Sequence, residues 1–135
     1  MSITDAKWIS SISQAEGSTT QINANVYGGS SGRNNNAIVN DNKVTITGGT
    51  FEKSVFGGRT QYGTANDNEV TISGGKIGKT SVTDTGYVYG GYVHNDGDAK
   101  SNKVTISGAT EVVGNVYGGY VKTKGNAESN EVTIS

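Results

Sequence analysis

Cysteine and proline are both absent from the 135-residue chain, and histidine occurs once. The lack of cysteine excludes disulfide bonds, thiol catalysis and cysteine-ligated zinc. A single histidine leaves little for acid–base or metal chemistry, so we expect no cofactor. The net charge of -1 gives no general attraction for nucleic acid or anionic membranes. Because no apolar run approaches the roughly 20 residues that span a bilayer, we expect no membrane insertion by this segment.

Two short phrases alternate along most of the chain. The first is Val-aromatic-Gly-Gly, with copies that begin at Val26, Val55, Val88 and Val116. The second is Asn-(Lys/Glu)-Val-Thr-Ile-(Ser/Thr), with copies that begin at Asn42, Asn68, Asn102 and Asn130. Copies of the first phrase lie 29, 33 and 28 residues apart. A repeat of this length, with two short strands and glycine-rich corners, is typical of one coil of a β-solenoid.

Apolar and polar residues alternate within the second phrase, which predicts a half-buried strand. The residues expected to face inward are Val44, Ile46, Val70, Ile72, Val104, Ile106, Val132 and Ile134. The residue before each valine alternates in sign, as Lys43, Glu69, Lys103 and Glu131. Coils stacked in parallel register would place these four residues in one column, where neighbouring opposite charges are mildly favourable.

We therefore predict an all-β fold, a parallel β-solenoid (β-helix) of about four coils with an N-terminal cap. The predicted copies lie near residues 26–54, 55–87, 88–115 and 116–135. An antiparallel β-sandwich of hairpins is the alternative, since Gly-Gly also forms tight hairpin turns. The repeat identity and the charge column favour the solenoid.

The spacing of the phrases also predicts irregular segments. The interval between Ile72 and Val88 is longer than its equivalents, so we expect an extra loop over residues 76–87. Small-residue segments are expected to form one turn in each coil. These segments are residues 63–65, 97–99 and 125–127.

Residues 1–25 match neither phrase cleanly and are expected to cap the solenoid. One interpretation is a short amphipathic helix over Asp5–Ala15, which would place Trp8, Ile9 and Ile12 on one side. The other is a degenerate coil. The chain ends at Ser135 within its own repeat, and we expect it to be part of a longer array.

The alternating Val-Tyr-Gly-Gly and Asn-x-Val-Thr-Ile-Ser-Gly-Gly phrases over residues 26–135 resemble the repeat regions of large bacterial surface proteins of the autotransporter type. In that family a β-solenoid passenger is exported and held outside the cell by a C-terminal membrane barrel. The resemblance implies an extracellular or bacterial cell-surface location. Its phrases are structural and transfer no functional residue.

The aromatic residue of the first phrase is the main candidate for a binding surface. These residues are Tyr27, Phe56, Tyr89 and Tyr117, with Tyr92 and Tyr120 close by. Stacked coils would align them into an aromatic ladder. Facing outward, the rings would contact carbohydrate or a protein partner. Facing inward, they would belong to the core, and this structural interpretation is the one we favour.

Other polar motifs are explained more simply by turns. Asp84-Thr85-Gly86 matches the motif of aspartic proteases, but the second copy that their mechanism needs is missing. Segments 95–98 and 66–68 offer oxygen ligands of the kind calcium prefers, without the spacing of known calcium loops. His94 has no repeated partner. We therefore expect no catalytic residue, no metal site and no enzyme activity.

These observations favour a non-catalytic structural or adhesive segment of a secreted or surface-anchored bacterial protein. Its partner would be a protein or glycan on a host or neighbouring cell. One alternative is a self-assembling filament module, because an open coil exposes unpaired strand edges. The other is a carbohydrate-binding module that uses the aromatic column.

Overall fold

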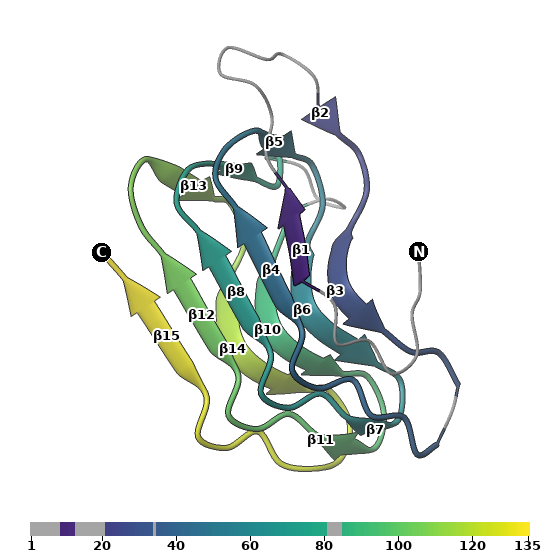
Figure 1. The fold of residues 1–135 in the computed structure, drawn as a ribbon. Coiled ribbons are helices and arrows are strands. Elements are labelled where there is room, and N and C mark those ends of the chain that lie inside the picture. The colour runs from purple at the N-terminus through teal and green to yellow at the C-terminus, as the bar shows by residue number, and fades with distance from the viewer. Residues whose placement is uncertain (1–8, 13–20, 34, 81–84) are drawn as a thin grey trace.

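The computed structural model describes residues 9–12, 21–33, 35–80 and 85–135. These residues form a parallel β-solenoid of about four coils, with no helix (Figure 1). Every strand pairing in the described chain is parallel and joins strands from successive coils. The predicted solenoid is thus confirmed and the antiparallel sandwich is wrong. No helix among the described residues is long and apolar enough to cross a membrane.

The second phrase forms the largest sheet. Its strands, in spatial order, are β1 (Ile9–Ile12), β4 (Lys43–Ile46), β8 (Glu69–Ile72), β12 (Lys103–Ile106) and β15 (Glu131–Ile134). The predicted inward valines and isoleucines of β4, β8 and β12 are buried in the core. Val132 and Ile134 are instead 42% and 69% exposed, because β15 is the edge strand and no neighbouring coil covers it.

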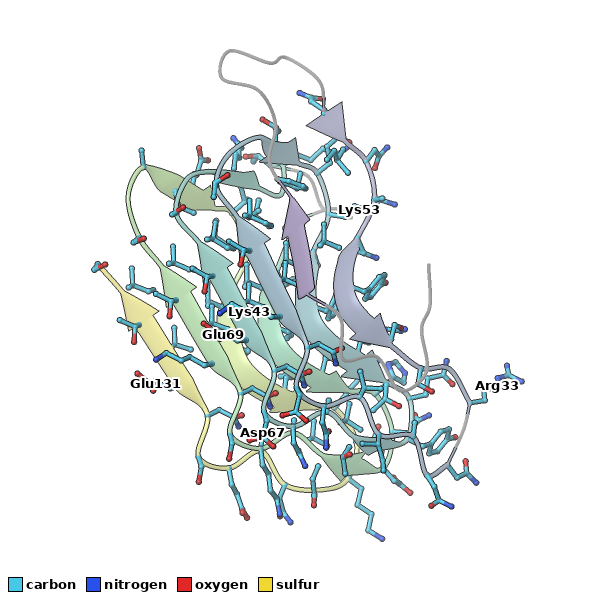
Figure 2. All side chains as sticks on the ribbon, in the orientation of Figure 1. Arg33, Lys43, Lys53, Asp67, Glu69 and Glu131 are labelled. Atoms are coloured by element: carbon cyan, nitrogen blue, oxygen red, sulfur yellow. The ribbon has the colours of Figure 1, made fainter. Side chains whose placement is uncertain are left out.

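The charge column follows the predicted register. Lys43 aligns with Glu69, Glu69 with Lys103 and Lys103 with Glu131. Figure 2 shows Lys43, Glu69 and Glu131 on the strands of the same sheet, and the Lys43 ammonium lies 3.1 Å from the Glu69 carboxylate. Both side chains are substantially exposed, so the pair contributes register more than stability.

The first phrase forms a second sheet that closes the other side of the core. Its strands, in spatial order, are β14 (Val116–Val121), β10 (Val88–Val93), β6 (Val55–Thr60) and β3 (Val26–Ser30). The first valine of β3, β6 and β10 is buried and packs against the valines and isoleucines of the largest sheet. Each coil therefore has one strand from each phrase, with the apolar core between them.

Two short sheets complete the coil where only corners and turns were predicted. The strands β2 (Gln21–Ile22), β5 (Thr50–Phe51), β9 (Gly75–Ile77) and β13 (Thr110–Val112) form one, and β7 (Gly63–Thr64) pairs with β11 (Gly97–Asp98) in the other. Phe51 and Ile77 align and are fully buried, so this side adds a third apolar column to the core. The small residues Ala65 and Ala99 are buried behind the β7–β11 pair.

A row of asparagines joins the coils inside the corner before the largest sheet. The amides of Asn42, Asn68 and Asn102 each donate to the Oδ1 of the asparagine in the next coil, at 2.8–3.0 Å. The three backbone N–H groups donate to the same oxygens at 2.9–3.0 Å. The residue before each asparagine turns the corner with a positive φ of 55–59°, namely Asp41, Asp67, Ser101 and Ser129. These buried amides are thus satisfied along the solenoid axis, except for Asn42 Oδ1, which has no donor among the described residues.

The N-terminal helix prediction is wrong where the structure describes the chain. Residues 9–12 form β1, which pairs with β4 so that Ile9 aligns with Lys43 and Ile12 with Ile46. Gln21–Ile22 likewise pairs with β5. These pairings fit the degenerate-coil alternative. Trp8 and the remainder of the proposed helix lie outside the described residues.

The extra loop begins later than predicted. Gly75–Ile77 belongs to a short sheet, so the additional residues lie between Ile77 and Val88. At the base of the insertion Gly78 and Gly86 lie against each other, both with a positive φ, and leave no room for a Cβ atom. The Gly114 N–H then donates to the Gly86 carbonyl, which returns the chain to the stack. Asp84, part of the protease-like motif, lies outside the described residues.

We predict that Asn68→Ala destabilises the fold strongly. The change removes the Oδ1 that accepts from the backbone N–H and the amide of Asn42. It also removes the Asn68 amide, which donates to Asn102 Oδ1 and to the Val39 carbonyl. Buried groups left without partners cost about 1–3 kcal/mol each, so the free energy of unfolding should fall by at least about 2 kcal/mol in urea. The exposed Asn35→Ala should change it by less than about 0.5 kcal/mol. Equal effects of the two changes would contradict the ladder.

We also predict that Gly90→Ala is far more damaging than Gly48→Ala. A Cβ at Gly90 would overlap the Gly118 carbonyl oxygen and lie 2.9 Å from the Asn102 Cβ, whereas a Cβ at Gly48 meets nothing within 4 Å. Overpacking of this kind costs about 1–3 kcal/mol or more. Thermal unfolding followed by circular dichroism should show a clear drop in Tm for Gly90→Ala only. Similar Tm values for both variants would be inconsistent with this close approach.

Candidate functional site

The four predicted aromatic residues form one continuous stack. Tyr27, Phe56, Tyr89 and Tyr117 align in register across β3, β6, β10 and β14. Successive ring centroids lie 5.1, 4.9 and 5.1 Å apart, and the planes differ by 15°, 10° and 7°. The expected ladder is therefore present.

The ladder lies on the outer face of its sheet and not in the core. The valines directly before the rings belong to the apolar core, and the rings, one position later, point the other way. Phe56 and Tyr89 are nevertheless only 8% and 9% exposed, because the neighbouring rings cover them. The rings therefore pack as a structural unit, as favoured from the sequence, but on the face of the sheet opposite the valine and isoleucine core.

A second column runs beside the first, three residues further along each strand. It consists of Ser30, Arg59, Tyr92 and Tyr120, which also align in register. Tyr92 and Tyr120 stack at 5.5 Å, and the Arg59 guanidinium lies 5.9 Å from the ring centroids of both Tyr27 and Tyr92. The sequence pointed to the two tyrosines but not to Arg59, whose place in the column appears only once the register is known.

The two columns contact each other across the paired glycines. The Tyr89 and Tyr92 centroids lie 5.0 Å apart with planes at 68°, and Tyr117 meets Tyr120 at 5.0 Å and 59°. The glycines between the columns carry no side chain that would separate the rings. The result is one aromatic surface, defined here as the four ladder residues together with Arg59, Tyr92 and Tyr120.

Stacking determines which parts of this surface a ligand can reach. Both faces of Phe56 and Tyr89 are covered by neighbouring rings, so a sugar cannot stack on them while the ladder is intact. Ring edges and hydroxyl groups remain, and some of these already bond within the chain. The Asn115 amide donates to the Tyr117 hydroxyl at 3.0 Å, and the Tyr92 hydroxyl pairs with His94 Nδ1 at 3.1 Å. Recognition at this surface would therefore use edges, hydroxyls and the Arg59 charge.

Two hydroxyls of the surface, those of Tyr89 and Tyr92, are shifted toward their neutral forms. Burial raises the pKa of Tyr89 well above its usual range, and the nearby hydroxyls of Tyr92, Tyr117 and Tyr120 raise it further. Burial also raises the pKa of Tyr92, although the Arg59 charge opposes the shift. At neutral pH the surface presents hydroxyl donors and acceptors with one cation.

The other candidate polar groups are used within the chain. Asp98 accepts from the Asn126 N–H and lies 3.2 Å from the Lys100 ammonium, and together they hold its pKa below the usual range. Asn68 belongs to the asparagine row, and the Asn66 side-chain oxygen Oδ1 accepts from the Lys100 N–H. Across the residues that the structure describes, no group of three or more His, Asp or Glu side chains is placed to hold a metal ion.

We predict a loss of stability at alkaline pH that depends on Tyr89. The unfolded chain ionises this hydroxyl near pH 10, whereas the folded chain keeps the proton to a higher pH. Deprotonation thus favours unfolding, and the free energy of unfolding should fall as pH rises above about 10. Urea unfolding at pH about 9 and about 11 measures this fall. Tyr89→Phe puts into this coil the residue that Phe56 supplies at the equivalent position of the preceding coil, and it should make the fall smaller. An equal fall in the variant would count against the role of the Tyr89 hydroxyl.

Comparison with known proteins leaves this surface to be interpreted from its own geometry. No family model matches the chain, and no curated protein or solved structure matches it. The function is therefore inferred from the stacked rings, the hydrogen bonds and the charges.

Proposed function

We propose that this chain is a non-catalytic structural and adhesive segment of a secreted or surface-anchored bacterial protein. The observation that carries the proposal is the continuity of its columns from coil to coil. Backbone pairing, asparagines, charges and aromatic rings all repeat in register along one axis. A stack of this kind is suited to projecting a surface away from an anchor.

Several interactions that bridge coils support a stiff structure. Lys79 on the insertion pairs with Glu52 at 3.0 Å, and Lys76 pairs with Glu111 at 3.1 Å across β9 and β13. The Lys100 ammonium lies within ion-pair distance of Asp98 and of Glu128 in the next coil. Each exposed pair contributes at most about 1 kcal/mol. Together with the buried rows they oppose slippage between coils.

The aromatic surface is the part of the segment best suited to a partner. Tyrosine and arginine are the residue types that contribute most to binding at protein interfaces. Here they lie on a rigid sheet, so little conformational entropy is lost when a partner binds. The partner would be a protein or glycan on a host or neighbouring cell, and the autotransporter-type resemblance of residues 26–135 supports the extracellular setting.

The adhesive role is tested with beads coated with the chain and applied to epithelial cells and to a glycan array. We predict retention on one of these surfaces and a loss of about tenfold or more in the apparent affinity of Tyr92→Ser/Tyr120→Ser. This factor corresponds to about 1.4 kcal/mol, less than the loss of two interface tyrosines commonly costs. Both rings are partly exposed, so the fold should survive, as circular dichroism would verify.

The matched control is Thr45→Ser/Thr71→Ser, on the outward face of the largest sheet. Binding that falls equally in both double variants would place the contact elsewhere. A chain that binds neither cells nor glycans would reduce the proposal to a purely structural role.

A further inference from the structure

The two edges of the largest sheet differ in how well they follow the repeat. At one edge, β15 carries Glu-Val-Thr-Ile directly after Asn130, and the internal strands likewise follow an asparagine. At the other, β1 pairs with β4 but carries Ile-Ser-Ser-Ile. Its register places Ser10 opposite Val44, where every other strand of the sheet has valine, and Ile9 opposite Lys43, where the others have a charge. The strand that covers β4 is thus a poor match for it.

The asparagine row has a direction, and the acceptor of its first member, Asn42 Oδ1, has no donor among the described residues. In each step, the backbone N–H and amide of one asparagine donate to the Oδ1 of the asparagine in the following coil. Asn42 Oδ1 is buried and has no hydrogen-bond donor within the part of the chain that the structure describes. An uncompensated buried acceptor costs about 1–3 kcal/mol. The missing partner would be an asparagine in the coil that precedes Asn42.

Asn130, the last member, has the complementary geometry. Its Oδ1 accepts from Asn102 and its amide donates to the Ala99 carbonyl, as in the preceding coils. By the pattern of the row, its backbone N–H and amide face the position of a following asparagine Oδ1. Asn130 of one molecule therefore supplies the donors that Asn42 of another lacks.

Charge and apolar surface match in the same register. Lys43 has Glu69 on one side, and Glu131 of a second copy would give it a carboxylate on the other (Figure 2). The exposed Val132 and Ile134 would then lie against the coil of Val44 and Ile46 and lose their contact with water. The unpartnered edge is therefore complementary to this chain itself.

The remaining strands fit without a gap. If β15 of one copy takes the position of β1 on β4 of the next, then β14 lies beside β3 and β13 beside β2. This arrangement places Tyr117 on Tyr27, which extends the aromatic ladder, and Val112 on Ile22, which extends the apolar column. When β15 takes the place of β1, three of the four sheets thus continue from one copy to the next.

We infer that β15 of one copy displaces β1 and pairs in parallel with β4 of a second copy, joining chains head to tail. This contact specifies how the chains would join in the self-assembling filament considered above as an alternative function. It does not depend on the proposed location or on binding by the aromatic surface.

The register is tested by disulfide trapping, which the absence of cysteine makes simple. Lys43→Cys and Glu131→Cys, prepared as separate full-length chains and mixed, would have Cα atoms about 4.8 Å apart, which suits a disulfide. Each chain then carries a single cysteine, so only an intermolecular bond is possible. We expect a heterodimeric cross-link at least about fivefold more abundant than in the control mixture of Lys43→Cys with Lys103→Cys.

Sedimentation velocity tests the assembly without cysteines. The unmodified chain should form larger species as its concentration rises, with an unchanged circular dichroism spectrum. Ile134→Lys should remain monomeric at the same concentrations, and its fold should persist because Ile134 is largely exposed in the single chain. A strictly monomeric unmodified chain would overturn the inference. So would a Glu131→Cys chain that cross-links mainly to itself, because that product would indicate edge-to-edge pairing of two β15 strands.

Discussion

The contact between each asparagine of the row and the paired glycines is the constraint on which the rest of the solenoid depends. A Cβ at Gly58 would lie within 2.7 Å of the Asn68 side chain, and the same holds for Gly29 with Asn42 and Gly91 with Asn102. Glycine therefore lets the strand of the first phrase approach the asparagine that opens the second. The two phrases alternate in the sequence because they are the two sides of one contact, repeated once per coil. Hydrogen bonds along the row then fix the spacing between coils, and the in-register columns follow from it.

The elements that were predictable from sequence are those in which a periodic pattern has one structural explanation. In Lys43–Ile46 and its copies every second residue is apolar, so only one face of the strand can be buried. Both the strand and the inward direction of its valine and isoleucine were therefore predictable. The Val-aromatic phrase has two large apolar residues in succession, and either Val55 or Phe56 satisfies an inward position. Which of the two faces inward depends on the neighbouring coils, whose aromatic rings stack on both faces of Phe56. Arg59 shares its column with Tyr92 although the two are chemically unlike, and no local pattern reveals that alignment.

Short strands were missed for a related reason. Thr50–Phe51 and Gly63–Thr64 contain two residues each, too few for alternation to be read. They are strands because the stacked coils hold them parallel at hydrogen-bonding distance, so their structure is a consequence of the fold and not of local preference. The apolar column of Phe51 and Ile77 does leave a trace, because each lies five residues after the last isoleucine of its preceding strand. β1 departs from the repeat in composition, and its pairing follows from position along the axis.

The insertion after Ile77 adds residues to one coil without adding to the height of the stacked strands. Its base is closed by Gly78 against Gly86. The Gly78 N–H donates to the Phe51 carbonyl of the preceding coil, and the Gly86 carbonyl accepts from the Gly114 N–H of the next. The path of the coil on either side of the insertion therefore depends little on the residues between these two glycines. Apart from the Lys79 ammonium, which pairs with Glu52 of the preceding coil, residues could be added, removed or exchanged there without altering any column. The corner between Gly78 and Gly86 is thus a place where the solenoid can carry a loop of different length or composition while its stacked strands stay the same.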